Sequence, residues 1–338
     1  MKAVVFYGKG DLRVENEFPL PTLRDDEVLV RVKACGVCGT DMHIYEGAQG
    51  ATDCHPPVIL GHELAGVVEK VGPGVTRVQA GQHVTVDPNI SCGACDACRR
   101  GDPHFCDRMS ATGVNHHGGF AQYCAVLEKQ VFPIAPSVPF EEAAMCEPLA
   151  CCLHGMDLSG VRCGDTVLIV GGGTIGMLML QLARLSGAAR IAMLETNEAR
   201  FALARRLGAD AVFNPARGDT RQALASGGFD NARVVVECVG RPETVQNAIE
   251  YAGKGATVMI FGLTAPDASV PFYPFEAFKK ELTIRTSYVN PHTQGRASQM
   301  IASGRLNLRE LMGQRLTLEE LPGAFAQGIT GGKAVVLP

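Results

Sequence analysis

The pattern of hydrophobic and polar residues changes near Glu147, and this change divides the chain into two parts. In the first part, short runs of β type, such as 27–32, 66–69 and 83–86, are separated by Gly, Pro and Asp. Turn residues at such regular intervals predict a compact, β-rich domain. From Thr166 onward, runs of strand type alternate with runs of helical type, which predicts right-handed βαβ units and a parallel sheet.

The alternating part begins with an apolar strand at 166–170 and ends near Thr286, where the pattern loosens. The returning chain is expected to finish with a strand at 333–337. Together the two patterns predict an α/β protein with a β-rich part and a parallel-sheet part. The remaining elements that we expect are strands over 190–194, 210–213, 233–237 and 256–261, and helices over 175–186, 198–207 and 244–251.

Length and composition narrow the class of protein. The chain has 338 residues, which is enough for about two domains, and its 46% hydrophobic content suits a globular protein. A net charge of −4 implies no general affinity for nucleic acid or an anionic membrane. The apolar stretch 167–183 contains four glycines between Asp165 and Arg184, so a buried strand, turn and helix explain it better than a membrane span. Thirteen cysteines without an export signal favour the reducing cytoplasm.

Four of these cysteines stand close together, as Cys92-Gly-Ala-Cys95-Asp-Ala-Cys98 followed by Cys106. Two-residue gaps let neighbouring thiolates turn toward one point, and four thiolates complete a tetrahedral zinc without an open position. An iron–sulfur cluster fits less well, because the ferredoxin pattern places its fourth cysteine about three residues on, before a proline. Cysteines of this density could also form disulfides or remain free thiols, and the spacing favours a closed, structural zinc site over both.

A glycine pattern of the form G-x-G-x-x-G joins the first strand of the parallel sheet to its helix. Gly171 allows the tight turn, Gly173 lets backbone approach a pyrophosphate, and Gly176 lets the helix pack on the strand. Glu195 stands 19 residues later, where a carboxylate accepts hydrogen bonds from ribose hydroxyls and repels a 2′-phosphate. NAD is therefore predicted rather than NADP, with Arg200 as the residue that could accept a phosphate instead.

Further side chains of metal-binding type are scattered along the first part of the chain. They are Cys38, His62, Glu63 and, near the change of pattern, Glu147. A mixed set of this kind leaves a coordination position open for a substrate, which is the catalytic arrangement. Since a histidine is more often structural than a ligand, spacing alone leaves two interpretations, an open metal site and a set of unrelated side chains.

Together these motifs resemble those of the zinc-dependent medium-chain dehydrogenases, the superfamily of the alcohol and polyol dehydrogenases. The resemblance covers essentially the whole chain and implies a β-rich, GroES-like catalytic domain with a zinc lobe, residues 1–148 and 287–338. It implies a Rossmann domain with a doubly wound parallel sheet at 149–286, and a homo-oligomer, either a dimer or a tetramer. The motifs that carry it are Cys38-Gly-Thr40-Asp-Met-His43, Gly61-His62-Glu63, the four-cysteine stretch, Glu147-Pro148 and the glycine turn.

The resemblance also implies roles for individual residues. Cys38 and His62 would hold a catalytic zinc, with Glu63 or Glu147 as the further ligand and no basis for ranking the two. An alcohol oxygen would take the open position, and its proton would leave through the Thr40 hydroxyl, the cofactor ribose and His43. The residues expected beside the cofactor, besides the three glycines and Glu195, are Thr174, Ile175, Arg200, Val239, Phe261, Leu263, Tyr288 and Val289.

Two departures from the sorbitol branch bear on the substrate. Ile44, with Tyr45 next, follows the relay histidine where a tyrosine is usual, and Val289-Asn290 stands where an Arg-Tyr pair is usual. Both remove polar groups that would hold polyol hydroxyls. The order His43-Ile-Tyr45 is closer to that of bacterial threonine dehydrogenases, which however typically carry aspartate in place of Glu147. Replacement contacts are expected from Asn290, His292, His116 or His117.

We therefore expect a cytoplasmic, NAD-dependent enzyme, with one catalytic and one structural zinc per chain, that oxidises a secondary alcohol to the ketone. A polyol, sugar alcohol or cyclitol is the expected substrate. The alternative enzyme oxidises an amino alcohol in the manner of a threonine dehydrogenase. The alternative without catalysis is a dinucleotide-sensing scaffold.

Overall fold

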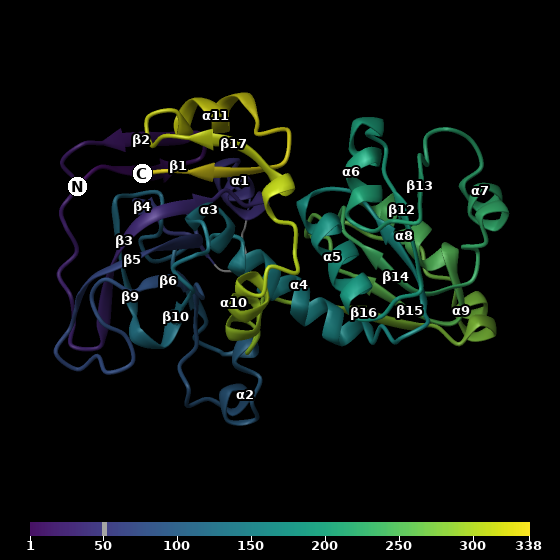
Figure 1. Cartoon of the computed structure of the whole chain (residues 1–338), viewed down its shortest axis with the longest axis horizontal. Helices are drawn as coiled ribbons and strands as arrows, with labels where there is room; N and C mark the ends of the chain where they lie inside the picture. Colours follow the sequence, from purple (N-terminus) through teal and green to yellow (C-terminus); the bar gives the residue numbers. More distant parts are fainter. Residues whose placement is uncertain (49–52) are drawn as a thin grey trace. The chain divides into compact units, whose positions relative to one another are not determined.

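The structure is a computed structural model that describes residues 1–48 and 53–338, and it contains two compact units (Figure 1). Unit 1 consists of residues 1–150 and 290–338, and unit 2 of residues 151–289. The mixed α/β architecture with a parallel sheet, predicted from the sequence, is confirmed. In the described part of the chain, no helix combines the length and apolar character that crossing a membrane requires.

Unit 1 is built on a large sheet to which both ends of the chain contribute. The C-terminal strand β18 (Lys333–Val336) pairs antiparallel with β3 (Glu27–Gly36), and β3 pairs antiparallel with β5 (Glu63–Val71). The returning chain thus completes the sheet begun by the N-terminal segment. The order of the sheet is β10-β6-β5-β3-β18-β17, with β9 also paired to β3. The remaining bounds are β6 His83–Val86, β9 Tyr123–Leu127, β10 Val131–Pro133 and β17 Met312–Leu316.

A smaller sheet of order β2-β1-β4 and the helices cover this core. In Figure 1 the yellow helix α11 lies beside the purple strands β1 and β2. Phe325 of α11 packs edge-to-face on Tyr45 and Phe120, so the C-terminal helix seals the apolar interior. The strands of this sheet are β1 Ala3–Gly8, β2 Asp11–Glu15 and β4 Val58–Ile59, and a separate two-stranded sheet consists of β7 Asn89–Ile90 and β8 Ser110–Ala111. The helices are α1 Gly39–Tyr45, α2 Asp96–Arg99, α3 Phe140–Ala143, α10 Gln294–Ala302, α11 Leu321–Gln327 and α4 Cys146–Ser159, which continues into unit 2.

Unit 2 is a parallel sheet of order β13-β12-β11-β14-β15-β16 with helical connections. Its central strand β11 (Thr166–Val170) is buried over its last four residues, as expected for a strand that is covered on both faces. The order of the strands reverses between β11 and β14, the point at which sheets of this kind bind ligands. The other strands are β12 Arg190–Leu194, β13 Ala211–Phe213, β14 Ala232–Glu237, β15 Ala252–Ile260 and β16 Thr283–Thr286. The helices are α5 Thr174–Leu185, α6 Phe201–Arg206, α7 Thr220–Gly227, α8 Pro242–Tyr251 and α9 Pro274–Lys280.

Two features of unit 2 differ from the sequence-based expectation. The helix expected over 198–207 is a 3₁₀ turn (Glu198–Arg200) followed by the shorter α6, because the Asn197 side chain accepts the Ala199 N–H and caps the turn. The elements α7, α9 and β16 lie outside the predicted set: α7 buries only Thr220 and Leu224, and α9 and β16 have no buried residue to produce an apolar pattern.

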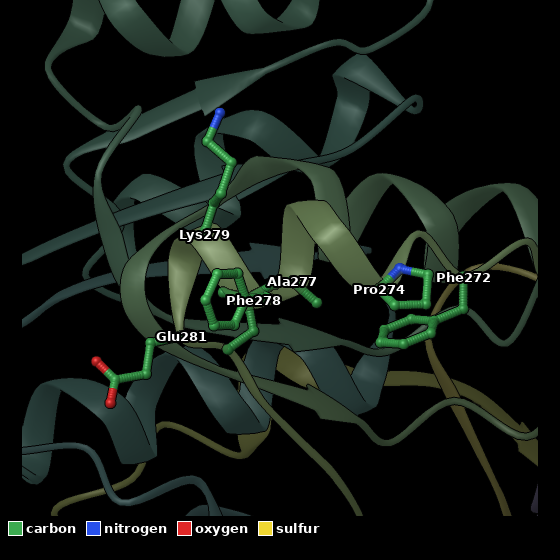
Figure 2. Close-up of a pocket in the computed structure, with 7 residues that line it drawn as sticks. Phe272, Pro274, Ala277, Phe278, Lys279 and Glu281 are labelled. Carbon is green, nitrogen blue, oxygen red and sulfur yellow. The ribbon is translucent and has the colours of Figure 1, made fainter.

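The surface formed by α9 and β16 is unusually apolar. Figure 2 shows the hollow at α9, where the rings of Phe272 and Phe278 stand outside the ribbon. Phe275 and Phe278 are 67% and 79% exposed, and all four residues of β16 are exposed at the end of the sheet. Contiguous exposed apolar side chains of this kind mark sites of association. We call this region the α9–β16 surface; its large apolar residues are Phe272, Tyr273, Phe275, Phe278 and Ile284.

Candidate active site and nucleotide site

Three candidate zinc ligands meet in unit 1. Cys38 directly precedes α1, whereas His62 and Glu63 stand at the start of β5. Because Gly36 of β3 pairs with Glu63 of β5, the sheet register carries Cys38 to the same place. The sulfur, imidazole nitrogen and carboxylate oxygen all lie within 4.8 Å of one another.

Asp41 organises two of these three side chains. It is fully buried; its Oδ2 accepts the backbone N–H of Cys38 at 2.9 Å, and its Oδ1 lies 3.4 Å from Nδ1 of His62. Burial alone would lower the pKa of His62, but Asp41 and Cys38 outweigh it and raise that pKa well above its usual value. Asp41 is absent from the residues predicted for the site, although it lies inside the motif that starts at Cys38.

Lys333, the first residue of β18, forms a buried ion pair with Glu63. Its Nζ donates to Glu63 Oε1 and to the Val37 carbonyl, and side-chain exposure is 8% for Lys333 and 1% for Glu63. Burial would lower the pKa of Lys333, but the charges of Glu63 and Cys38 raise it, so the ammonium form is stabilised. Only one carboxylate oxygen is used, since Glu63 Oε2 is buried without a hydrogen-bond partner among the described residues.

The donor set fits a zinc ion. Thiolate, imidazole and carboxylate are the ligands that Zn²⁺ takes in open, catalytic sites. Glu63 Oε2 is buried without a hydrogen-bond partner among the described residues, so it can accept a cation. Burial lowers the pKa of His62, but Asp41 and Cys38 raise it by more, so this pocket favours added positive charge. Metal-binding histidines commonly turn their second nitrogen to a carboxylate, as His62 does toward Asp41.

The other catalytic candidates belong to α1, which directly follows Cys38, and to α4. Thr40 and His43 are both half-buried in α1 and stand three residues apart, which places them on one side of the helix. Glu147 is buried in the first turn of α4. Burial lowers the pKa of Lys333, whereas Glu63 and Cys38, and to a smaller extent Glu147, raise it. Among the described residues, the group of ligand atoms within 4.8 Å contains Glu63 but not Glu147.

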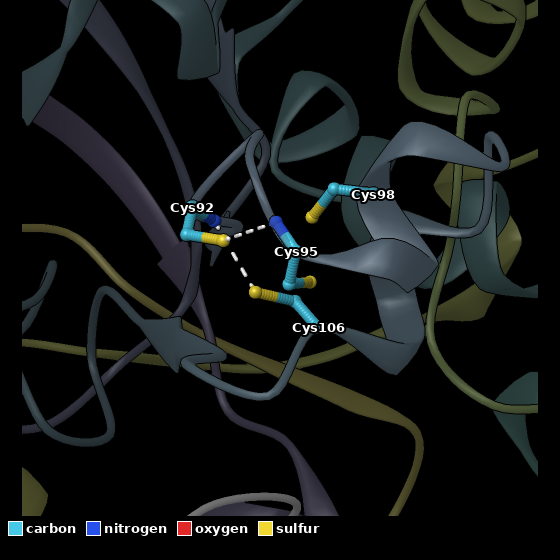
Figure 3. A group of neighbouring side chains, drawn as sticks. All are labelled: Cys92, Cys95, Cys98 and Cys106. Carbon is cyan, nitrogen blue, oxygen red and sulfur yellow. Dashed lines mark hydrogen bonds between the residues drawn. The ribbon is translucent and has the colours of Figure 1, made fainter.

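The four-cysteine stretch forms a second compact group, and Figure 3 shows its sulfur atoms facing a common centre. Backbone N–H groups of Ala94 and Cys95 each donate to Cys92 Sγ at 3.4 Å, and they lower the pKa of Cys92 to about 5. Cys106 Sγ accepts the N–H of Cys92 at 3.3 Å. Burial and the neighbouring cysteines raise the pKa of Cys98 to about 11, so only part of the group favours the thiolate that binds zinc. The fit to the four-sulfur zinc site expected from the spacing rests on the closeness of the sulfur atoms.

In unit 2 the glycine turn joins β11 to α5 as expected. Gly171 has φ +99°, and a Cβ added at Gly176 would lie 1.8 Å from the Gly171 carbonyl oxygen. No larger residue fits at Gly176, because the helix packs directly on the turn. Gly173 is the N-cap of α5 without a side-chain cap, and Thr174, Ile175 and Gly176 form the first turn. Such a helix start is suited to bind a phosphate group.

Glu195 follows β12 and is tied to this turn. Its Oε2 accepts the Gly172 N–H at 2.8 Å, its Oε1 accepts the Asn197 N–H at 2.7 Å, and the residue is 7% exposed. Arg200 lies 3.6 Å from the carboxylate and is itself about one-third exposed. The Glu195 carboxylate therefore has a fixed position beside the glycine turn, and the Arg200 guanidinium lies next to it.

The remaining cofactor candidates follow the carboxyl ends of neighbouring strands. Val239 comes after β14, Phe261 and Leu263 come after β15, and both loops lie at the same edge of the sheet as the glycine turn. Val239 and Leu263 are 41% and 64% exposed. Tyr288 and Val289 follow β16; Val289 has φ +48°, an uncommon conformation for a β-branched residue.

The four candidate substrate contacts already have partners within unit 1. Asn290 Oδ1 accepts a hydrogen bond from Asn89 Nδ2, and Asn290 Nδ2 donates one to Gln294 Oε1. The His292 ring nitrogen lies 3.0 Å from the Gly101 carbonyl oxygen. The His116 ring bonds the Ser110 hydroxyl, and His117 accepts the Ile59 N–H. Asn290 is buried in its contacts, whereas His116, His117 and His292 are exposed.

Comparisons with known proteins agree with this geometry. Residues 24–136 match the alcohol dehydrogenase GroES-like domain, and residues 174–303 match the zinc-binding dehydrogenase family. The D-altritol 5-dehydrogenase of Agrobacterium fabrum is 35% identical over 97% of this chain and 96% of its own length. The L-threonine 3-dehydrogenase of Caldanaerobacter subterraneus is 38% identical over 80% of this chain and 78% of its own length.

A solved structure is also closely similar over its full length. It is that of a zinc-binding dehydrogenase from Sinorhizobium meliloti 1021 bound to NADP, with 38% identity and a TM-score of 0.96. The match covers 100% of this chain and 99% of the chain from Sinorhizobium meliloti. The chain belongs to the family of zinc-dependent medium-chain alcohol and polyol dehydrogenases. It is therefore an oxidoreductase, with the GroES-like and Rossmann domains that the sequence predicts.

The Lys333–Glu63 pair leads to a prediction about stability. Lys333→Met should lower the free energy of unfolding by about 3–5 kcal/mol, because it leaves the buried Glu63 carboxylate without its counter-charge. The measurement is urea unfolding at neutral pH. Lys2→Met is the matched control, since it removes a lysine whose pair with Glu319 is exposed, and it should have a much smaller effect.

Adding Glu63→Gln to Lys333→Met should recover a large part of the loss, because both buried charges are then gone. Equal stability of Lys333→Met and the unsubstituted protein would show that the pair does not constrain this site.

Proposed function

We propose that the enzyme oxidises a secondary alcohol to a ketone with zinc and NAD, and that the alcohol is a polyol, a sugar alcohol or a cyclitol. The observation that carries the proposal is the open group of sulfur, nitrogen and oxygen donors at Cys38, His62 and Glu63. The glycine turn with Glu195 beside it supplies the second requirement, a place for the dinucleotide. Zinc held by the open group would lower the pKa of an alcohol oxygen and so prepare the carbon to give up hydride.

Within the open group, Cys38 and His62 are the proposed permanent ligands. Glu63 is the nearer of the two candidate carboxylates, because its ligand atom lies in the group whereas that of Glu147 does not. Lys333 holds Oε1 of Glu63 and leaves Oε2 as the available acceptor. Glu147 then serves through a water or in exchange with Glu63.

Thr40 and His43 are the proposed path for the alcohol proton. The hydroxyl of Thr40 can accept a proton and pass one on, and so can the imidazole of His43 one helical turn later. Both are half-buried, so a proton that reaches His43 has a route to solvent. The protein's other task is to hold the nicotinamide, for which Val239, Phe261, Leu263, Tyr288 and Val289 remain the proposed contacts.

Two further assignments complete the proposal. The four cysteines hold a structural zinc that closes their loop, and all thirteen cysteines are unbridged thiols, which suits a cytoplasmic enzyme. The substrate class is supported by the similarity to D-altritol 5-dehydrogenase. The similarity to an L-threonine 3-dehydrogenase supports amino-alcohol oxidation as the second candidate function.

Replacing Cys38 separates the two proposed metal sites. Cys38→Ala should lower kcat/KM by at least about a thousandfold and reduce bound zinc from two per chain to one, while the fold persists. Zinc content by plasma mass spectrometry and circular dichroism are the readouts. Cys163→Ala, which changes an exposed cysteine outside both groups, is the control and should keep both zinc ions. Full activity of Cys38→Ala would disprove the assignment of the open site.

Steady-state assays identify the alcohol and the cofactor together. Galactitol, arabinitol, sorbitol, inositols and L-threonine are each offered with NAD and with NADP. We expect the highest kcat/KM with a polyol and NAD, because the Glu195 carboxylate is held where a 2′-phosphate would meet it. Activity with threonine alone would refute the polyol assignment. A preference for NADP, the cofactor bound in the relative from Sinorhizobium meliloti, would instead assign the 2′-phosphate to Arg200.

We also propose that the enzyme is a homo-oligomer, a dimer or tetramer, and that a second copy covers the α9–β16 surface. Strand β16 ends the sheet, and antiparallel pairing with its own copy would satisfy the exposed edge of both strands. A two-fold axis brings the same patch together twice, so Lys279 of one copy can face Glu281 of the other. Self-complementary charge around an apolar centre favours a second copy over an unrelated partner.

Light scattering coupled to gel filtration tests this assembly. Phe278→Asp should reduce the mass of the particle, because it places a charge in the apolar centre of the contact. Leu20→Asp alters a comparably exposed leucine in unit 1 and should leave the mass unchanged. A monomeric unsubstituted protein, or a Phe278→Asp protein of unchanged mass, would contradict the proposal.

A further inference from the structure

Glu237, a residue outside the sequence motifs, is the most fully buried carboxylate at the nucleotide edge of unit 2. It is the last residue of β14 and is 0% exposed. A buried carboxylate is costly unless hydrogen bonds compensate it. The hydrogen bonds of its side chain fall on Oε1, and Oε2 has no hydrogen-bond partner among the described residues. The buried charge is therefore compensated at one oxygen only.

The oxygen Oε1 of Glu237 collects three donors from the loop that follows β14. It accepts the N–H of Val239 at 2.8 Å, the N–H of Gly240 at 3.0 Å and the Thr244 hydroxyl at 2.8 Å. Thr244 lies in the first turn of α8. One carboxylate oxygen therefore fixes the loop at two successive peptides and ties it to the start of the next helix.

The backbone at Glu237 also joins the neighbouring loops. Its carbonyl oxygen accepts the N–H groups of Phe261 and Gly262 after β15, each at 2.9 Å. The next residue, Cys238, donates its N–H to the carbonyl of Val170, which directly precedes the glycine turn. Glu237 thus stands where three loops meet, those after β11, β14 and β15.

The loop that Glu237 fixes reaches the dinucleotide turn through Val239. A Cβ added at Gly171 would lie 2.5 Å from Cγ2 of Val239, so this side chain rests directly on the first glycine of the turn. At Gly240, φ is +77°, and an added Cβ would lie 2.3 Å from the Leu263 carbonyl oxygen. The loop is therefore packed closely on both sides. A small rotation of its backbone would change the contact of Val239 with Gly171 and that of Gly240 with Leu263.

We propose that Glu237 is a positioning residue for the pyridine dinucleotide. Its Oε1 holds the Val239–Gly240 loop in the position in which Val239 contacts both the cofactor and the glycine turn. This inference rests on the proposed dinucleotide-dependent function. Glu237 belongs to unit 2 and the proposed zinc ligands to unit 1, so the effect expected of Glu237 is on the binding of the cofactor. The arrangement explains why a buried carboxylate is used: charge-assisted hydrogen bonds hold two N–H groups and a hydroxyl more firmly than a neutral acceptor does.

The test compares Glu237→Gln with the unsubstituted, zinc-loaded protein. Gln keeps an oxygen acceptor in a side chain of the same shape but loses the charge, so the fold should persist while the Kd for NADH rises about tenfold. NADH binding is measured by the increase in its own fluorescence. The KM for NAD should rise in parallel, while the KM for the alcohol and the zinc content should stay unchanged.

Two further variants complete the design. Thr244→Val removes one of the three donors and should raise the Kd for NADH less than Glu237→Gln does. Asp219→Asn is the matched control: Asp219 also accepts two backbone N–H groups, at the start of α7, so the substitution can lower the Tm but should not change the Kd.

The outcomes are distinct. An unchanged Kd for Glu237→Gln, with or without a lower Tm, would overturn the positioning role and leave Glu237 a structural residue. An equal loss of affinity in Asp219→Asn would also overturn it, because the effect would then be a general loosening of unit 2. Failure of the unsubstituted protein to bind either NADH or NADPH would refute the proposed function itself, independently of Glu237.

Discussion

The balance of buried charge around Glu63 is the constraint on which the rest of unit 1 depends. Cys38, Asp41 and Glu63 bring negative or potentially negative groups into one poorly solvated place, and removal of such groups from water is costly unless positive charge accompanies them. Lys333 supplies one positive charge from the C-terminal strand. Burial lowers the pKa of His62, but Asp41 and Cys38 raise it by more, so the site favours a second positive charge. A zinc ion held by Cys38 and His62 would supply this second positive charge, so the excess of negative charge would favour metal binding.

This constraint also gives a reason for the path of the chain in unit 1. Strand β18 is the last strand of the sequence, yet it lies inside the large sheet, between β3 and β17. This position brings Lys333 within reach of Glu63 of β5 across β3. In unit 2 the buried acids are balanced differently: Glu195 is held mainly by backbone N–H groups, with a cation at its margin, and Glu237 by backbone N–H groups and a hydroxyl. In unit 1 the buried charges thus favour an added cation, whereas in unit 2 the buried acids fix the loops at the carboxyl ends of the strands.

The sequence predicts those features whose physics is local. The glycine turn, the acid 19 residues beyond it and the spacing of the four cysteines each specify their geometry over a short stretch, and the fold class follows from the alternation of strands and helices. The role of Asp41 could have been inferred, since it lies in the motif with Cys38, but its contact with His62 depends on the register of β3 and β5. Lys333 and Glu63 are 270 residues apart, and no local pattern predicts their contact. The substrate contacts expected at Asn290 and His292 rest on polarity alone; Asn290 is buried in hydrogen bonds within unit 1, whereas His292 is exposed and stays a prediction.

The central claim is that an alcohol oxygen binds a metal ion held by Cys38 and His62, within hydride-transfer distance of the nicotinamide. The most direct measurement is a crystal structure of the zinc-loaded enzyme with NADH and a non-reactive polyol analogue, with zinc located by its anomalous scattering. We predict two zinc positions per chain, one enclosed by the four cysteines and one bound to Cys38, His62 and an oxygen of the analogue. Zinc at the four cysteines alone, or an analogue bound away from Cys38, would contradict this claim.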